Sequence, residues 1–270
     1  MEKLLKTYLD IGIRHPVKIF FAADAHMTYT NDSDSEEHKI LEKERTKTFY
    51  NEGEKPFHDP EYYFREAIKM AEDMDALLVL GGDMIDIQTN GNIAAFKNII
   101  ENHDMMFTPG GHEHQKRCVR TVEEPDNFFR SSRAKLKKLL NRFDLDFDSR
   151  IINGLNILTV DSSLDYFNER TLTRFKQELA KGLPCVVFSH DPLTDPYLMA
   201  EEEKYRYKNL TAKEYRISRE MYELLETSDL VKAYFSGHYH LNHESKLKNG
   251  NPHIITNGLF AGTARYIEVR

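Results

Sequence analysis

Five short apolar runs mark this chain, and each of them stops abruptly at a polar cluster. The runs cover residues 17–23, 76–80, 105–108, 185–189 and 231–235. Continuous apolar runs of this length, bounded by Gly and Pro, are typical of strands that are buried on both faces. They predict a buried sheet core, with aspartates, glycines and histidines collected where its strands end.

Helical patterns lie between the predicted strands. One begins at Pro60, with Asp59 as its cap, and its apolar residues follow helical spacing: Phe64, Ala67, Ile68 and Ala71. A second covers residues 128–140, and a third begins at a capping-box pattern, Thr211 to Glu214. Asn153-Gly154 and Asn249-Gly250 predict tight hairpin turns. Alternating strands and helices with added hairpins predict an α/β sandwich, in which ligands bind at the carboxyl ends of the strands.

Composition sets broad limits on the class of protein. The 270 residues are 40% hydrophobic, which is ample for a sizeable core, and length alone leaves one large domain or two small ones open. The net charge of -7 argues against a nucleic-acid partner, since the densest basic stretch, 130–142, has the spacing of a solvated helix face. Cys118 and Cys185 are too few for a disulfide framework. No signal peptide or membrane span is evident, so we expect a cytoplasmic protein.

Two polar segments interrupt the alternation of strands and helices. Residues 27–57 and 191–210 each follow a polar cluster directly, so each is a candidate lid over a site. A solvated surface loop is an equally good interpretation of the first segment. The second carries Tyr205, Arg206 and Tyr207, which favours a lid because aromatic side chains need a surface to pack on.

The polar clusters form an ordered set of motifs: Asp24-x-His26, Gly82-Asp83-x-x-Asp86, Gly110-Gly111-His112-Glu113, His190 and Gly237-His238-x-His240. Each motif alone is weak evidence, and the histidines outside them need no role beyond hydrogen bonding. As a set, over residues 17 to 260, they closely resemble the calcineurin-like metallophosphoesterases. The resemblance implies a four-layer α/β/β/α sandwich, here as a single domain over residues 1–270.

The resemblance also implies a dinuclear metal site. The first ion would bind Asp24, His26 and His240, and the second would bind His190 and His238, with Asp83 bridging the two. Imidazole and carboxylate ligands together suit Mn, Fe, Zn or Co. Two such ions clamp the attacking and leaving oxygens of phosphoryl transfer, and a metal-bound water supplies hydroxide near neutral pH.

Two further residues match catalytic positions of the family. His112 would protonate the leaving oxygen and Asp86 would orient it, although Asp86 has the alternative of merely capping a helix or turn. We expect Glu113 to support its loop and His114 to lie on the surface or in a lid.

The third motif departs from the family pattern Gly-Asn-His-[Asp/Glu]. The family Asn ligates the second metal through its carbonyl oxygen, and this chain has Gly111 there. Glycine offers no ligand, so we expect the second ion to bind more weakly unless His114 compensates.

The leading hypothesis is therefore a phosphoric ester hydrolase for a small phosphate mono- or diester. Diesters, the phosphodiesterase reaction, and nucleotides are favoured because the family commonly handles them, and manganese is among the expected metals. The alternative is a phosphate-ligand binding or scaffolding protein on the same fold with little or no turnover.

Overall fold

The computed structural model describes residues 1–49, 60–114, 126–164, 166–193 and 210–270. Its strands are β1 (Lys3–Leu9), β2 (Val17–Ala22), β3 (Leu77–Leu80), β4 (Met105–Phe107), β5 (Phe147–Ile152), β6 (Leu155–Val160), β7 (Cys185–Phe188), β8 (Val231–Ser236), β9 (His243–Lys246), β10 (Pro252–Ile255) and β11 (Thr263–Val269). Its α-helices are α1 (Glu36–Phe49), α2 (Pro60–Asp73), α3 (Asn90–Ile100), α4 (Asp126–Leu139), α5 (Glu169–Leu179) and α7 (Ala212–Thr227). The five apolar runs are confirmed as strands, with ends that differ from the prediction by a residue.

The strands form two sheets. The first has the order β1-β11-β2-β3-β4, and the second has the order β5-β6-β7-β8-β10-β9. In the first sheet β2, β3 and β4 are parallel, and in the second β6, β7, β8 and β10 are parallel. Parallel neighbours end on the same edge, so the polar residues that follow β2, β3 and β4 meet there, and those after β7 and β8 meet likewise.

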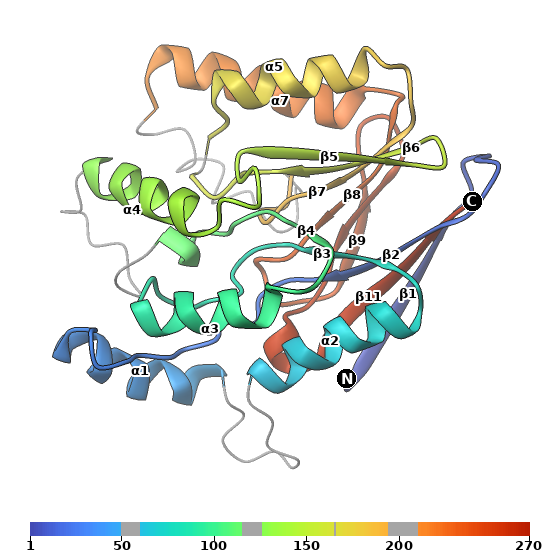
Figure 1. The fold of residues 1–270 in the computed structure, drawn as a ribbon. Helices are drawn as coiled ribbons and strands as arrows, with labels where there is room; N and C mark the ends of the chain where they lie inside the picture. Colours follow the sequence, from blue (N-terminus) through green and yellow to red (C-terminus); the bar gives the residue numbers. More distant parts are fainter. Residues whose placement is uncertain (50–59, 115–125, 165, 194–209) are drawn as a thin grey trace.

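Helices cover the outer face of each sheet, so the molecule has four layers. Figure 1 shows α2 and α3 against the first sheet and α5 and α7 against the second. Apolar contacts fill each gap: Phe20 packs toward α2 and α3, Phe21 packs between the sheets, and Phe175 packs between α5 and the second sheet. Successive residues of a strand point to opposite faces, which explains why the central strands are apolar throughout. The predicted α/β/β/α sandwich is confirmed.

The predicted helices and hairpins are present. Phe64, Ala67, Ile68 and Ala71 of α2 are buried, and Thr211 and Glu214 make the reciprocal capping-box hydrogen bonds of α7. Asn153 and Gly154, with φ of 50° and 84°, join β5 to β6 in a two-residue turn. The β9–β10 connection is longer than predicted, since β9 ends at Lys246 and β10 begins at Pro252. The Asn249 side chain donates to the backbone oxygens of Ser228 and Val231 and holds this connection against the end of α7 and β8.

Among the helices that the structure describes, none combines the length and the apolar character needed to cross a membrane.

Candidate metal centre

The loops that follow the central strands are hydrogen-bonded to one another. The backbone N–H groups of Asp24 and His26 donate to the oxygens of Gly82 and Asp83, at 2.9 Å each. The N–H of Gly237 donates to the oxygen of His190 at 3.1 Å. Across the sheets, the N–H of His238 donates to Oδ2 of Asp24 at 3.0 Å, so the predicted site residues of both sheets meet at one edge of the sandwich.

Most of the predicted metal ligands have a strained backbone. Positive φ angles occur at Asp24 (57°), His26 (51°), Asp83 (52°), His238 (74°) and His240 (52°). Residues with a Cβ rarely adopt this left-handed conformation, and its cost is about 1–3 kcal/mol per residue. Such strain persists where surrounding contacts fix it, and it concentrates at functional sites.

Two glycines next to the motif residues allow a close approach of the loops. A Cβ on Gly110 would collide with the Asp83 carboxylate, and a Cβ on Gly237 would collide with the Asp24 carboxylate. Only glycine fits at these two positions while the carboxylates keep their places.

The first cluster of ligand atoms contains Asp24, His26 and His240. Nε2 of His240 lies 3.0 Å from Nε2 of His26 and 3.3 Å from Oδ1 of Asp24, and His26 Nε2 lies 3.9 Å from that same oxygen. Ligand atoms that share one ion at about 2.1 Å lie about 3 to 4 Å apart, so this spacing suits a common ion. Asp24 and His26 are buried, which sets the donor atoms apart from bulk water.

The second cluster contains Asp83, His190 and His238. Nε2 of His190 lies 3.0 Å from Oδ2 of Asp83 and 3.2 Å from Nδ1 of His238. Oδ2 of Asp83 also lies 4.0 Å from Nε2 of His26, so this one carboxylate oxygen lies between the two clusters.

Hydrogen bonds fix which nitrogen of two histidines can act as a ligand. His26 Nδ1 lies 3.0 Å from Asp86 Oδ1, and His190 Nδ1 lies 2.9 Å from the backbone oxygen of Gly81. Both partners are acceptors, so each Nδ1 carries the proton and each Nε2 keeps its lone pair toward the cluster. Metal-binding histidines are oriented in this way by carboxylates and backbone carbonyls. The residues therefore fit two transition-metal ions.

A third group, made up of His26, Asp86 and His112, also has closely spaced donor atoms. Hydrogen bonds among these residues explain the close spacing. His112 Nδ1 lies 2.7 Å from the backbone oxygen of Asp86 and 3.1 Å from its Oδ1. The guanidinium of Arg45 binds the same carboxylate at two points, 2.7 Å from Oδ2 and 2.9 Å from Oδ1. With its charge paired by Arg45, Asp86 belongs to a hydrogen-bonded cluster beside the ligand atoms.

Glu113 supports its loop, as the sequence predicts. Its buried carboxylate accepts hydrogen bonds from the backbone N–H groups of Asp83, Met84 and Gly110, at 2.9, 2.7 and 2.7 Å. Burial together with the nearby charge of Asp83 raises the pKa of Glu113 to about 7. Glu113 thus ties the third motif to the second and fixes the position of Asp83.

The charges in the site favour a protonated His112. Although burial opposes an ionised carboxyl group, the imidazoles of His190 and His112 hold the pKa of Asp83 well below its usual range. Burial likewise opposes the charged form of His112, but the carboxylates of Asp83 and Asp86 raise its pKa to about 9. The His112 side chain is 21% exposed, so this acidic group reaches solvent.

His114 does not lie on the surface or in a lid, so that prediction was wrong. It is fully buried, its Nε2 lies 3.0 Å from Ser163 Oγ, and Ser132 Oγ donates to its backbone oxygen at 2.8 Å. Burial and the charge of Arg133 lower its pKa to about 3, so the ring is neutral. Because His114 is engaged beside α4 and belongs to none of the three groups, it gives no support to compensation for Gly111.

A second correction concerns the basic stretch 130–142. Lys135, Lys137 and Lys138 are exposed as expected, but Arg133 is buried. It pairs with two buried carboxylates, those of Asp146 and Asp161.

No motif of the sequence predicts the contacts that α1 makes with the site. α1 lies within the polar segment 27–57 and ends at Phe49, whose ring stacks on His26 with centroids 4.0 Å apart and planes 5° apart. Arg45 of the same helix binds Asp86, as described above. No local sequence signal marks these two residues, because their partners lie far away in the chain. Residues 50–57 of this segment lie outside the described structure.

Of the second polar segment, Asp191 is described and lies at the site. Its Oδ1 is 3.7 Å from Nδ1 of His238, and its N–H donates to Ser162 Oγ at 2.9 Å. Residues 194–209, including Tyr205, Arg206 and Tyr207, lie outside the described residues, so their proposed contact with substrate stays a prediction.

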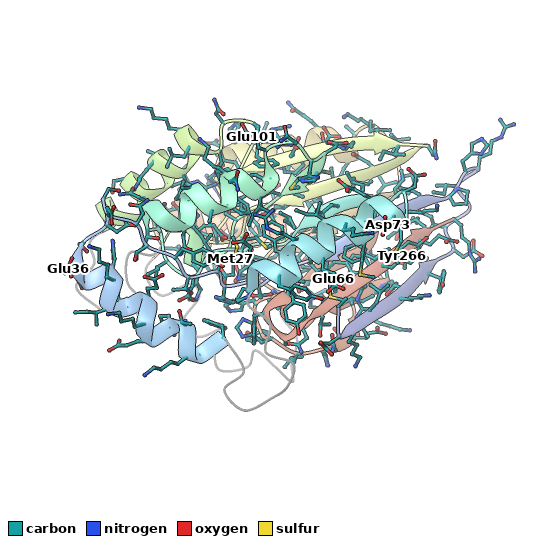
Figure 2. All side chains as sticks on the ribbon, turned by 60° about the horizontal axis from the view of Figure 1, so that its bottom comes forward. Met27, Glu36, Glu66, Asp73, Glu101 and Tyr266 are labelled. Carbon is teal, nitrogen blue, oxygen red and sulfur yellow. The ribbon has the colours of Figure 1, made fainter. Side chains whose placement is uncertain are left out.

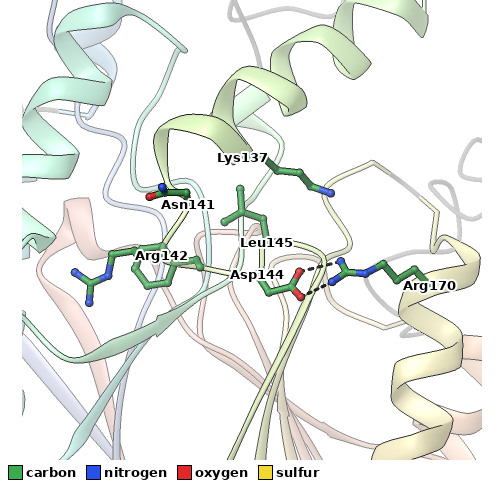
Figure 3. Close-up of a pocket in the computed structure, with 7 residues that line it drawn as sticks. Lys137, Asn141, Arg142, Asp144, Leu145 and Arg170 are labelled. Carbon is green, nitrogen blue, oxygen red and sulfur yellow. Dashed lines mark hydrogen bonds and ion pairs between the residues drawn. The ribbon is translucent and has the colours of Figure 1, made fainter.

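A pocket of about 390 Å³ beside α4 also contains basic residues (Figure 3). Its Arg170 makes a two-point ion pair with Asp144, and Lys137 pairs with Asp146 at 2.6 Å. Since these cations already have carboxylate partners, the pocket offers little for a phosphate.

Comparison with known proteins identifies the family. The model of the calcineurin-like phosphoesterase family matches residues 17–242, and the chain belongs to that family. It is therefore a metallophosphoesterase, a phosphoric ester hydrolase of a family that depends on two metals.

Two solved structures share the fold. A dimetal phosphatase from Danio rerio is 14% identical, with a TM-score of 0.51 over 90% of this chain and 88% of that one. A 5'-nucleotidase from Candida albicans is 11% identical, with a TM-score of 0.50 over 96% of this chain and 48% of that one. The chain thus spans about half of the nucleotidase. A comparison with curated proteins gives no match.

Proposed function

We propose that this chain hydrolyses a small phosphate mono- or diester, with a nucleotide among the candidate substrates. The observation that carries the proposal is the pair of ligand clusters on either side of Asp83 Oδ2. Asp24, His26 and His240 would hold one ion, and His190 and His238 the other, with Asp83 shared. The ions would be Mn, Fe, Zn or Co, which these ligands suit. Two such ions supply Lewis-acid activation of water and of the phosphoryl group.

The residues of the chain itself supply the proton for the leaving oxygen. His112 keeps its Nδ1 proton against Asp86, so the proton that the charged ring would release is the one on Nε2. That proton is the one to be given to the leaving oxygen as the ester bond breaks. Asp86 keeps the ring in place and stabilises its charge, which is how positioned general acids work.

Gly111 gives the second ion one ligand fewer than the family pattern. We propose that this ion binds more weakly than the first, and that Asp191, close to His238, partly compensates through its charge. The same glycine is the observation that favours the second candidate function, a phosphate-ligand binding or scaffolding protein with little turnover.

We also propose a domain organisation and a cellular compartment for the enzyme. All 270 residues would form one domain, with segments 27–57 and 191–210 as lids. The contacts of Arg45 and Phe49 with the site support the lid role of the first segment. Two cysteines in the whole chain are in keeping with a reduced, cytoplasmic compartment.

A metal-supplemented screen tests the function. Aryl phosphomonoesters and diesters would be assayed with each metal, and the metal content would be measured on the same sample. We expect turnover that a chelator abolishes and one metal restores. Phosphate binding without turnover under any metal would favour the second candidate function.

A further inference from the structure

Helix α1 is a polar helix whose last turn contacts the site. Its first turn is solvated, and Figure 2 shows Glu36 pointing away from the molecule. Phe49 at its end is 6% exposed, and the Arg45 guanidinium lies 4.9 Å from the centre of the Phe49 ring. Phe49 in turn covers His26. The two side chains that α1 places at the site therefore support each other.

Arg45 restrains a carboxylate that is completely buried. Asp86 has no exposed surface, and Arg45 Nε and Nη2 lie 2.7 Å from Oδ2 and 2.9 Å from Oδ1. Two parallel contacts between a guanidinium and a carboxylate fix the plane of the carboxylate as well as its place. A lysine, with one charged nitrogen, gives no such control over the plane.

The plane of Asp86 matters because one oxygen serves two rings. Oδ1 lies 3.0 Å from His26 Nδ1 and 3.1 Å from His112 Nδ1, and the rings of His26 and His112 meet at 85°. Rotation of the carboxylate would break one or both contacts. His112 keeps a second contact, to the backbone oxygen of Asp86, so its ring would stay in the site but lose its alignment.

We propose that Arg45 is a positioning residue for the hydrolysis, acting through Asp86 on the orientation of His112. This inference rests on the proposed function, in which His112 protonates the leaving oxygen. Arg45 lies on α1, which carries none of the motif residues of the site, so α1 and the acid would be coupled: the acid is aligned when the last turn of α1 is in place.

The test compares leaving groups in Arg45→Ala and Arg45→Lys. The matched control is Lys47→Ala, which removes the same charge from an exposed position of the same helix. Each protein is assayed on a nitrophenyl ester, whose leaving group departs without a proton, and on the corresponding alkyl ester, which needs one. Metal content and thermal unfolding are measured on the same samples, so loss of metal or of fold is seen directly.

We expect kcat of Arg45→Ala on the alkyl ester to fall about 10- to 100-fold, part of the about 10²–10⁴-fold that a general acid supplies, with little change in KM or metal content. The nitrophenyl ester should be affected less than about threefold on the same reasoning. Added guanidinium ion should restore part of the lost rate in Arg45→Ala and none in His112→Ala. Arg45→Lys should show the same selectivity in a milder form.

Equal losses on both esters, or no rescue by guanidinium in a folded, metal-loaded variant, would overturn the inference. His112→Ala, measured alongside, distinguishes a failure of the proposed general acid from a failure of the positioning role of Arg45. If it lacks leaving-group selectivity, the proposed acid is wrong. If His112→Ala shows leaving-group selectivity and neither Arg45 variant does, His112 remains the proposed acid and only the role of Arg45 is rejected.

Discussion

His112 Nδ1 lies 2.7 Å from the backbone oxygen of Asp86 and 3.1 Å from its carboxylate oxygen Oδ1. Asp86 thus holds one nitrogen of the ring from two sides and leaves Nε2 to carry the exchangeable proton. The same carboxylate, together with Asp83, favours the charged ring. These contacts support His112 as the proposed proton donor of the site.

The first prediction follows from that arrangement. His112→Ala should slow hydrolysis of an ester with a poor leaving group by about 10²–10⁴-fold, because protonation of the leaving oxygen is lost. A nitrophenyl ester of the same phosphate should lose far less. The measurement is kcat on both esters, and equal losses would mean that His112 binds phosphate or supports structure.

The second prediction concerns Gly111. Gly111→Asn should strengthen binding of the second ion by about tenfold or more, since disturbance of even an outer-shell partner costs a metal site 10–100-fold. Positive φ angles occur at Gly12, Gly82, Gly154, Gly182, Gly250 and Gly262 but not at Gly111, so its φ does not disfavour a residue with a Cβ. Activity at low metal concentration should rise with the affinity.

Metal titration of the parent, Gly111→Asn and a matched control checks this. Gly182→Asn is the control: a Cβ at Gly182 meets no atom within 4 Å, and Asn tolerates the positive φ of 68° there better than most residues do. Unchanged affinity in a folded Gly111→Asn protein would show that another group already occupies the ligand position.

The third prediction is that Asp191→Asn weakens the second ion. Asp191 Oδ1 lies 3.7 Å from His238 Nδ1, close enough for its charge to favour a bound cation. The loss should be at least several-fold, because a nearby charge supplies about 1 kcal/mol even at the dielectric constant of water, and the first ion should be affected less. Competition titration would resolve the two ions, and an equal loss at both would point to a change of fold.

The fourth prediction concerns stability. Arg133 is buried against the carboxylates of Asp146 and Asp161. Arg133→Met leaves the buried charge of Asp161 without this cation, while Asp146 keeps Lys137. The free energy of unfolding should fall by about 3–5 kcal/mol. Urea unfolding measures it, and Arg133→Met with Asp161→Asn should recover part of the loss. A loss below about 1 kcal/mol, as for a surface pair, would contradict this account.

The strands could be predicted because burial on both faces leaves a local signature. β2 is apolar at Phe20 and Phe21 since one faces α2 and the other faces the second sheet. The site residues were visible for a related reason: polar side chains such as Asp83 and His190 directly follow apolar runs. Their roles as ligands remain predictions.

Long-range contacts left no such signature. Arg45 is one basic residue in a polar helix, and its meaning depends on Asp86, 41 positions away. His114 was misplaced because its polar neighbours in sequence suggested exposure, whereas α4 covers it through Ser132. The burial of Arg133 likewise depends on Asp161, on another loop, and not on the helical spacing of charges around it.

The measurement that tests the central claim most directly is the metal content of Asp83→Asn beside that of the parent protein. Asp83 Oδ2 lies 3.0 Å from His190 Nε2 and 4.0 Å from His26 Nε2, so its charge serves both clusters. We predict two ions in the parent, loss of occupancy at both positions in Asp83→Asn, and loss of phosphoesterase activity with them. Normal folding with two ions still bound would contradict the account.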